Sequence, residues 1–463
     1  MKEGPDTPSL PPRRERVLPE TLIGRWVRPL ARFLEIEAAS GVVLLACAAT
    51  ALIAANSSHE HAFHAFWETP IGFSLGSLEL RHPLHHWIND GLMTIFFFVV
   101  GLEIKREFVL GELRDRRAAA LPLAAALGGM LVPAALYLLL QLGEPGERGW
   151  GIPMATDIAF VVGVMALMGP RVPHGLRIML LTLAIADDIG AVIVIAVAYS
   201  DALSGAALAA AAVGFGFCFL FNRIGIRTVA VYLVLGAGIW LATLSSGVHP
   251  TVAGVLLGLM TPARAWIGDR SFRDLLRDVV SHLEGDRKAY LPDGQHTVLT
   301  QVAYAARETV PPLERLEIAL HPWVAFGIMP LFALANAGVH IDASELLHPI
   351  EIAVVAGLVI GKPVGIVLVS WIFVKAGLAR LPGGVSWPAM AGAGLLAGVG
   401  FTMALFIAGL ALDGSLLDPA KIGILAGSAI AGVLGSLVLY LALPAPGAGT
   451  AAAPPIQVGG DSR

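Results

Sequence analysis

The sequence predicts an all-α membrane protein that crosses the bilayer many times. Of its 463 residues, 56% are hydrophobic and 14% are charged, and the mean hydropathy is +0.74. In a soluble globular domain about 25% of the residues are charged. Apolar runs of about 20 residues, the length that an α-helix needs to cross a bilayer, recur from Phe33 to Leu443. Because backbone groups inside lipid must bond to one another, these runs indicate a bundle of membrane-spanning helices.

The apolar runs divide into twelve predicted spans. In chain order they cover residues 34–56, 85–104, 118–141, 151–168, 175–199, 203–221, 226–246, 247–262, 316–338, 349–375, 388–411 and 420–443. An even number of spans places both termini on the same side of the membrane.

The positive charges indicate which side this is. The two tails and the loops after spans 2, 4, 6, 8 and 10, together with the span ends that border these loops, hold all but four of the 31 lysine and arginine residues. The exceptions are Arg81, Arg148 and Lys421 in the opposite loops, and Lys362 inside a span. Since loops rich in Lys and Arg stay in the cytoplasm, we expect cytoplasmic N- and C-termini.

The chain is predicted to form one twelve-helix domain, residues 33–443, between two tails. The N-terminal tail, residues 1–32, is rich in Pro and Arg and lacks the apolar core of a cleavable signal peptide. We interpret it as a disordered basic segment beside the membrane, where anionic lipid would attract it. Residues 444–463 are interpreted as a second disordered cytoplasmic tail.

Two connecting segments are long. The outward loop 57–84 contains HEHAFH (His59–His64), for which an ordinary solvated loop and a metal site are both open, and an alternating ETPIGFSLGSLELRH typical of a small hairpin. In the cytoplasmic loop 263–315, SFRDLLRDVVSHLEG has helical apolar spacing and predicts an amphipathic helix on protein or membrane. The two cysteines, Cys47 and Cys218, lie in apolar runs and indicate neither a disulfide framework nor a thiol-rich metal site.

Two adjacent aspartates, Asp187 and Asp188, lie near the middle of the apolar stretch IMLLTLAIADDIGAVIVIAVAY. One carboxylate at that depth costs roughly 2.5–3.5 kcal/mol on insertion scales. Ionisable residues inside the membrane are rare and usually bind or relay small cations or protons. The pair therefore indicates ion transport.

Two predicted spans carry helix breakers. Span 4, GIPMATDIAFVVGVMALMGP, is short and contains Thr156 and Asp157. Span 11, SWPAMAGAGLLAGVGFTMALFIAGL, has four glycines near its centre. Interrupted spans in corresponding positions of two halves are typical of transporter binding sites, so spans 3–5 and 10–12 could be inverted repeats. For span 11 alone, glycines that only permit tight helix packing remain an alternative.

Lys362 lies deep in span 10, in VVAGLVIGKPVGIVLVSWIF. A buried ammonium needs a partner, and Asp187, Asp188 and Asp157 are the candidates. The pair could be purely structural, joining span 10 to span 5. A pair that breaks when the aspartate binds a cation would be both structural and functional.

Five further ionisable residues lie at the ends of spans. Asp90 and Glu103 flank span 2, and Glu103 stands beside two basic residues, where an interfacial ion-pair cluster is the simplest interpretation. His249 lies near the start of span 8, as a satisfied interfacial histidine or as a proton relay. Glu317 and His321 lie four residues apart, hence on one helical face. They form either a plain surface pair or a pH sensor, since histidine titrates near neutrality.

Several motifs resemble those of the NhaA-type sodium/proton antiporters. The matching strings are VVGLEIKRE, ATDIAF, LAIADDIGAV, SGVHPTVAGV, LHPWVAF with PLFALANAGV, GKPVGI, and GVGFTMALFIAGL, and they occur in order from about residue 33 to residue 443. The combination of ATDIAF, ADDIGA and a buried GKP is specific. The chain departs from the pattern at Ile318, where some members have a second histidine, and in its longer N-terminal tail and 263–315 loop.

The resemblance implies twelve helices in NhaA-like inverted repeats, with spans 4 and 11 interrupted and crossing in the middle of the bacterial inner membrane. It implies Asp188 as principal cation ligand and Asp187 as its proton-carrying neighbour, with Lys362 paired to this site. Thr156 and Asp157 would lie at the crossing, where Asp157 would offset the partial positive charges of helix N-termini.

The resemblance also implies a cytoplasmic pH-response region containing Glu103, Glu317 and His321. Asp90 and His249 are further candidates for pH response or gating. Family members often form dimers through the outward hairpin, which here lies in loop 57–84. We expect no cofactor, no enzymatic activity and no nucleic-acid partner.

The function expected from these features is export of Na⁺, or Li⁺, in exchange for incoming protons, for sodium and pH homeostasis. Protons and cation compete for one carboxylate site, because each lost proton leaves a charge that a hard cation neutralises through oxygen ligands. If two protons enter for each Na⁺, exchange is electrogenic and the membrane potential contributes roughly 2.3 kcal/mol per 100 mV. Acid is expected to inhibit, because protons then hold the site.

Three other functions also use intramembrane aspartates. A sodium-coupled symporter for an organic solute, on a similar fold, is the main alternative, but the sequence has few polar groups outside the acid cluster. An intramembrane aspartyl protease usually carries a Gly-x-Gly-Asp string, which is absent. A prenyl-transfer enzyme needs spaced aspartates for magnesium–diphosphate, whereas Asp188 is followed by Ile-Gly-Ala.

Overall fold

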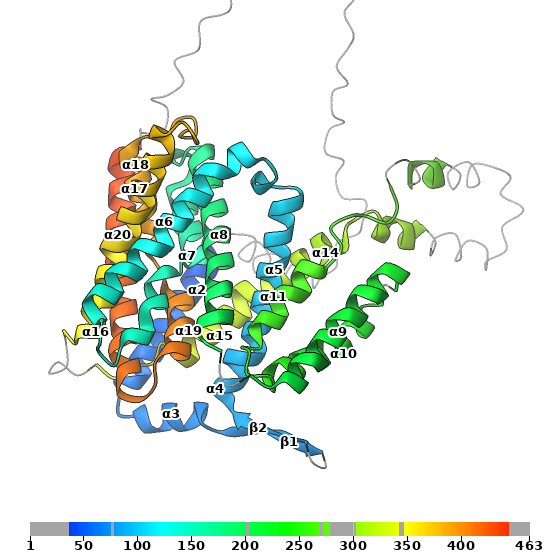
Figure 1. Ribbon diagram of the computed structural model, residues 1–463, viewed down its shortest axis with the longest axis horizontal. Coiled ribbons are helices and arrows are strands. Elements are labelled where there is room, and N and C mark those ends of the chain that lie inside the picture. Colours follow the sequence, from blue (N-terminus) through cyan, green and yellow to red (C-terminus); the bar gives the residue numbers. More distant parts are fainter. Residues whose placement is uncertain are drawn as a thin grey trace, which may run out of the picture.

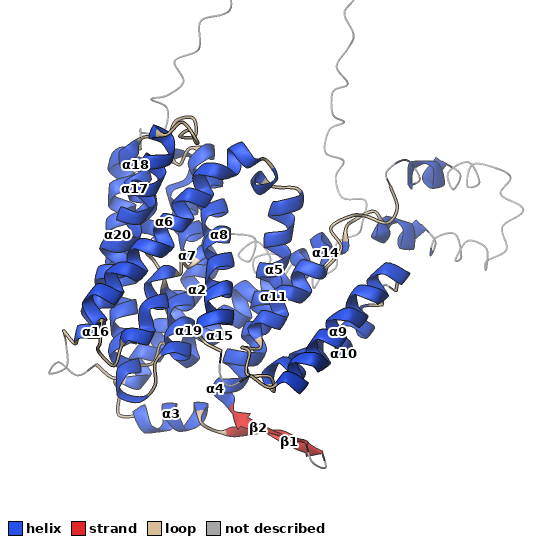
Figure 2. Cartoon of the chain, in the orientation of Figure 1, coloured by secondary structure: helices blue, strands red, loops and turns tan. Residues whose placement is uncertain are grey.

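The structure is a computed structural model that describes residues 37–75, 78–200, 203–226, 228–268, 270, 272–277, 300, 302–341 and 347–443. The two predicted tails and most of the predicted amphipathic helix in loop 263–315 lie outside the described residues, so these interpretations stay predictions. Within the described part, Figure 2 shows a helical bundle with a β hairpin projecting from one end. This agrees with the all-α polytopic fold that the sequence predicts.

Figure 1 labels the α-helices and the two strands, and η denotes the π and 3₁₀ segments between them. The first half contains α2 (Glu37–Ala55), α3 (Glu60–Trp67), β1 (Pro70–Leu75), β2 (Leu78–Pro83), α4 (Leu84–His86), η1 (Trp87–Leu92), α5 (Met93–Val109), η2 (Glu112–Arg114), α6 (Arg116–Gln141), η3 (Glu147–Met154), α7 (Ile158–Met168), η4 (Gly169–Arg171) and α8 (His174–Ala198). The second half contains α9 (Gly205–Ile224), α10 (Val229–Leu244), α11 (Thr251–Met260), α14 (Pro312–Trp323), η5 (Val324–Ile328), α15 (Met329–Asn336), α16 (Pro349–Ala356), η6 (Gly357–Gly361), α17 (Lys362–Lys375), α18 (Trp387–Ala397), α19 (Phe401–Ala411), η7 (Gly414–Leu416) and α20 (Leu417–Ala442).

Every predicted span coincides with a helical segment to within a few residues. Among the described residues, eight helices are long and apolar enough to cross a membrane, and up to ten if each of two bent helix pairs counts as one span. The shorter apolar helices α10 and α11 coincide with predicted spans seven and eight. Length and composition therefore support a multi-pass protein, whereas twelve crossings stay a prediction.

Helices α6 and α17 pack so closely that their backbones touch. A Cβ atom at Gly128 would fall on the carbonyl oxygen of Gly365, and one at Gly365 would fall on that of Gly128. Further along, Pro133 of α6 lies against Gly361, so the two helices run antiparallel. Antiparallel packing is the relationship that inverted repeats require of their corresponding helices.

Each half contains an interrupted helix between two long ones. In the first half, η3 ends at Met154, residues 155–157 are extended, and α7 begins at Ile158. In the second half, α18 ends at Ala397 and α19 begins at Phe401, with a bend of 48° between them. The backbone N–H of Asp157 donates to the carbonyl oxygen of Val399 at 2.7 Å. The two breaks therefore lie against each other, as the resemblance predicts.

Two π turns precede prolines in the long helices. In chain order, η5 leads into Met329–Pro330 of α15, and η6 leads into Lys362–Pro363 of α17. Proline cannot donate the usual helical hydrogen bond, and a wider turn accommodates that loss. As a result Lys362 begins a new α-helical segment directly after a wide turn.

The predicted hairpin in loop 57–84 is present. Strands β1 and β2 pair antiparallel, with Pro70 opposite Pro83 and Leu75 opposite Leu78. The indole N–H of Trp87 donates to the carbonyl oxygen of Ile71 at 2.8 Å and ties the hairpin to η1. The same loop forms α3, which the sequence analysis did not predict. Phe63 and Trp67, four residues apart and therefore on one face of a helix, both pack against the hydrophobic core.

Candidate functional site

The aspartate pair lies at the middle of α8. Asp187 is 1% and Asp188 is 2% exposed, so neither reaches the outer surface of the bundle. Helical neighbours point about 100° apart, and the two carboxylates accordingly have different surroundings.

Asp187 is held in a network of fixed partners. Its Oδ2 atom lies 2.9 Å from Nζ of Lys362 and 2.7 Å from Oγ1 of Thr156. Lys362 also donates to the carbonyl oxygen of Met154, the last residue of η3. The Thr156 hydroxyl lies 2.9 Å from a second acceptor, the carbonyl oxygen of Ala397. The network thus joins α8 and α17 to both helix breaks, and Asp187 is the partner of Lys362 among the three candidates.

Asp157 connects the starts of the two interrupted helices. Its Oδ1 accepts from the backbone N–H of Phe160 at 3.2 Å, which caps α7. Its Oδ2 accepts from the backbone N–H of Thr402 at 3.2 Å and from the Thr402 hydroxyl at 2.5 Å, in the first turn of α19. A helix N-terminus presents unpaired N–H groups and a partial positive charge. Asp157 supplies acceptors and negative charge to both.

Asp188 is different from these two carboxylates. Its side chain makes no hydrogen bond to any described residue, although Asp157, Asp187 and Lys362 are close enough to interact with it electrostatically. It lines a cavity of about 1010 Å³, which Thr156 and Asp157 also line. Asp187 and Lys362 are not part of the cavity wall. Asp188 is therefore a buried carboxylate that a small ion in the cavity can reach.

The cavity extends to one end of the bundle, where exposed residues of η2 and of the preceding turn form its mouth. Its wall carries seven carboxylate side chains, those of Glu103, Glu107, Glu112, Asp115, Asp157, Asp188 and Glu317. Three guanidinium groups, those of Arg106, Arg114 and Arg177, also line it. A cleft lined mainly by one sign of charge raises the local concentration of counter-ions, so this one attracts cations.

Glu317 and His321 lie on the cavity-facing side of α14, as their spacing predicts. Glu317 pairs with Arg106 rather than with His321, and its second oxygen, Oε2, is buried without a hydrogen-bond partner among the described residues. Glu103 also lines the cavity, close enough to Glu317 and Arg106 to interact with both. These three predicted residues therefore form one cluster in the wall of the cavity.

Asp90 and His249 do not belong to that cluster. Asp90 lies 16 residues before Arg106 on the continuous segment formed by η1 and α5, about 24 Å along a helix. Its Oδ2 lies 3.0 Å from Nε2 of His86, and its Oδ1 lies 3.4 Å from Nε2 of His249. His82 of β2 stacks on His86 at 4.3 Å, and burial together with His86 lowers the pKa of His82. This separate cluster, which consists of Asp90 and the histidines around it, lies at the hairpin end of the molecule.

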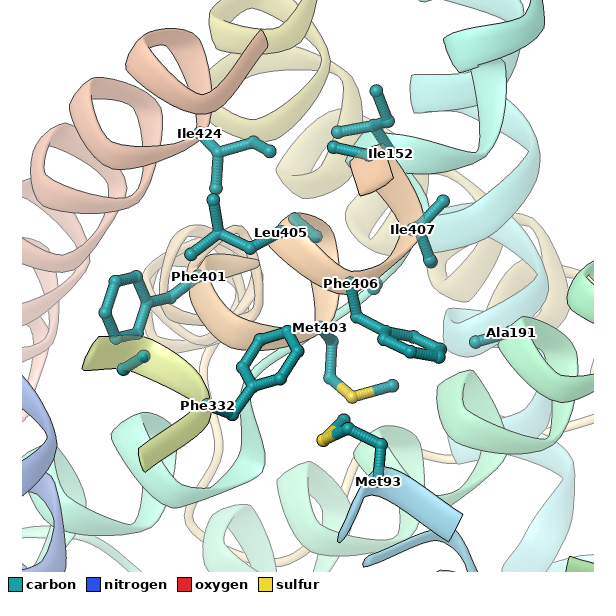
Figure 3. Packing of buried hydrophobic residues seen from close by; sticks show 14 of the residues in the cluster. Met93, Ile152, Ala191, Phe332, Phe401, Met403, Leu405, Phe406, Ile407 and Ile424 are labelled. Carbon is teal, nitrogen blue, oxygen red and sulfur yellow. The ribbon is translucent and has the colours of Figure 1, made fainter. Parts of the chain in front are cut away.

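A wall of apolar side chains surrounds α19, the helix that continues past the crossing. Figure 3 shows Phe332, Met403, Phe406 and Met93 converging beside it. Phe406 contacts Phe332, Phe97 and His249, with ring centroids 6.1, 5.4 and 5.3 Å apart. All residues from 401 to 408 are buried. Packed apolar residues thus lie between the helix crossing and the Asp90 cluster.

Two polar side chains that the sequence does not single out hold the start of α19. Thr402 binds Asp157, and Ser428 of α20 accepts from the backbone N–H of Phe401 at 3.1 Å. The available signal for Thr402 is a threonine two residues after Gly400, because such residues favour helix starts. No comparable signal marked Ser428, which lies inside a long helix.

Sequence comparisons agree with this architecture. The model of the family described as Na⁺/H⁺ antiporter 1 matches residues 31–439. The chain is 52% identical over 432 residues, which are 93% of this chain and 97% of the relative, to the Na⁺/H⁺ antiporter NhaA of Rhodopirellula baltica. It is 51% identical over 424 residues, 92% of this chain and 97% of the relative, to the NhaA of Rhizobium meliloti. It is 45% identical over 427 residues, 91% and 94% of the two chains, to an NhaA of Vibrio vulnificus. The chain therefore belongs to the Na⁺/H⁺ antiporter family of these NhaA proteins.

Proposed function

We propose that the protein is a secondary active transporter that exports Na⁺ in exchange for protons, with Asp188 as the residue that binds them alternately. One observation carries this assignment: Asp188 is a buried carboxylate without a hydrogen bond to any described residue, at a cavity lined by acidic groups. A carboxylate in that position is either protonated or paired with a cation, because an isolated buried charge is too costly. Its relatives carry the name Na⁺/H⁺ antiporter, which fits this alternation.

Asp187 would supply the second exchangeable proton. Its negative charge is neutralised by Lys362, 2.9 Å away. A cation that arrives at Asp188 repels Lys362 and attracts both carboxylates, so it weakens the Lys362–Asp187 pair. Thr156 and the backbone carbonyls at the breaks offer oxygen ligands of the kind that Na⁺ prefers at interrupted helices.

Access would alternate between the two ends of the bundle. In this structure the cavity reaches Asp188 from the end that carries Glu112 and Asp115, the end predicted to be cytoplasmic. Apolar residues around Phe406 close the other side. Movement of the two interrupted helices against their surroundings would open the hairpin end, as in other transporters with inverted repeats.

Electrogenic exchange follows if two protons enter for each Na⁺ that leaves. Both termini would be cytoplasmic and the membrane would be the bacterial inner membrane. Li⁺, which is also a hard cation with oxygen preference, would be a second substrate. Glu103, Glu317 and His321 would adjust the activity to cytoplasmic pH. The exposed hairpin β1–β2 would pair with that of a second copy, since a two-stranded sheet has free edges for such pairing.

Purified protein in proteoliposomes tests this proposal. Adding NaCl or LiCl, but not KCl, should move protons, with no organic solute present, which separates exchange from sodium-coupled solute symport. An imposed potential, with the side of proton entry negative, should accelerate the movement. An exchange rate that does not depend on the potential would refute the electrogenic stoichiometry. Absence of Na⁺-dependent proton movement would refute the proposal itself.

A further inference from the structure

The carboxylate of Asp157 is shared between two helix starts, and Thr402 contributes two of its bonds. The backbone N–H and the hydroxyl of Thr402 donate to it at 3.2 and 2.5 Å, and the backbone N–H groups of Ala159 and Phe160 donate to it at the start of α7. Thr402 is 0% exposed and does not line the cavity, so an ion in the cavity does not touch it.

These bonds determine whether Asp157 can ligate a cation. A carboxylate offers about four acceptor sites, and the donors of Thr402, Phe160 and Ala159 take up those of Asp157. Asp188 lines the same cavity with no hydrogen bond to a described residue. Of the two carboxylates in the cavity wall beside the crossing, one is fixed as a helix cap and the other is free.

We infer that Thr402 is a positioning residue for cation exchange, a role that rests on the function proposed above. By donating its hydroxyl to Asp157, Thr402 withholds that carboxylate from the transported cation and leaves Asp188 to bind it. Without the hydroxyl, Asp157 Oδ2 can turn toward the cavity and become a second anionic ligand. The cation is then bound more tightly and released more slowly.

Thr402→Val, which has nearly the same shape without the donor, tests this inference. We expect its KM for Na⁺ to fall about threefold to tenfold, within the range expected from the net contribution of a typical hydrogen bond, and its kcat to fall as well. Thr402→Ser retains the hydroxyl and should keep the KM of the unaltered protein. Damage to folding alone would lower the amount of active protein without tightening Na⁺ binding.

Ser428→Ala is the matched control. Ser428 accepts from Phe401, one residue before Thr402, and makes no contact with Asp157. This variant weakens the start of α19 to a similar degree and should leave the KM for Na⁺ unchanged. In an Asp157→Asn background, Thr402→Val should have no further effect on KM, because the amide carries no charge to release.

Affinity for Na⁺ is measured both by exchange in proteoliposomes and by calorimetric titration of the purified protein. An unchanged or raised KM in Thr402→Val, or an equal fall in Ser428→Ala, would overturn the role of Thr402. If Thr402→Val fails to fold, Thr402→Cys, with its weaker donor, should give an intermediate fall, and an unchanged affinity there would equally overturn it. Unaltered protein that binds Na⁺ without exchanging protons would instead overturn the proposed function, while the calorimetric comparison still decides the role of Thr402.

Discussion

Lys362 and Asp187 form an ion pair of 2.9 Å from which solvent is excluded, with both side chains 0% exposed. The pair links the first residue of α17 to the middle of α8. Lys362 also reaches the carbonyl oxygen of Met154 in η3. One ammonium group therefore connects both halves of the bundle at the site where the interrupted helices meet.

Replacing one partner of this pair should destabilise the protein more than replacing both. Lys362→Gln leaves Asp187 as an unpaired buried charge, and Asp187→Asn leaves Lys362 unpaired. Each change should lower the free energy of unfolding by about 3–5 kcal/mol, and the double variant should lose much less than the sum. Denaturation in detergent measures all three.

Lys375→Gln is the control for this cycle. Lys375 lies at the exposed end of the same helix, where its ammonium contacts the Trp371 ring at 4.6 Å, so its replacement should change the free energy of unfolding by about 1 kcal/mol or less. Additive losses in the double variant would show that the two buried residues act separately, contrary to the geometry.

Asp188→Asn should abolish Na⁺-dependent proton movement without lowering stability. The substitution removes a buried negative charge that makes no hydrogen bond within the described part of the chain. We therefore expect the unfolding midpoint to stay the same or rise, in contrast to the loss in Asp187→Asn. Fluorescence dequenching in vesicles and thermal unfolding measure the two properties. Asp413→Asn, on an exposed loop, should keep both, and measurable exchange by Asp188→Asn would contradict its assignment as the alternating site.

Gly128→Ala should separate α6 from α17. Its new Cβ would meet the backbone of Gly365, which cannot move aside without shifting the helix that carries Lys362. We expect a loss of about 1–3 kcal/mol from overpacking and reduced exchange. Gly409→Ala, in α19 with open space around the new methyl group, should instead be neutral or stabilise by up to about 1 kcal/mol, because alanine favours helices. Equal unfolding midpoints for the two variants would contradict the close contact.

The sequence predicts the spans and most of the charged site because intramembrane charges are rare and so stand out. Asp187, Asp188, Asp157 and Lys362 could each be identified without coordinates. The aspartate that pairs with Lys362 could not be identified from the sequence, because the choice depends on the rotation of α8 relative to α17. Asp90 and His249 are candidates for pH response together with Glu317, but the structure pairs Asp90 with His86 and His249 at the hairpin end and Glu317 with Arg106 in the cavity wall.

The position of the second helix break was also only partly predictable. Four glycines in span 11 look alike in sequence, but Gly392 packs against Leu439 and Gly394 against Pro363 inside α18. The helix instead breaks around Gly398 and Gly400, where the chain meets the extended segment of the other half. A glycine that permits close helix packing and a glycine that interrupts a helix differ in the residues of other helices that surround them. The local sequence does not show which residues these are.

Phe406→Ala should make the protein permeable to protons in the absence of Na⁺. The Phe406 ring fills the space between Phe97, Phe332 and His249, so its removal leaves a cavity between the helix crossing and the Asp90 cluster. We expect a stability loss of about 3–5 kcal/mol. A void that admits water beside polar groups at both ends also offers protons a path that needs no Na⁺.

Proton flux into proteoliposomes without Na⁺ should rise severalfold in Phe406→Ala and stay low in Phe406→Leu, which keeps most of the volume. Phe217→Ala is the control for loss of a phenylalanine elsewhere, because the Phe217 side chain on α9 is 48% exposed. Liposomes that stay tight with Phe406→Ala would show that a different layer of the bundle keeps protons from crossing.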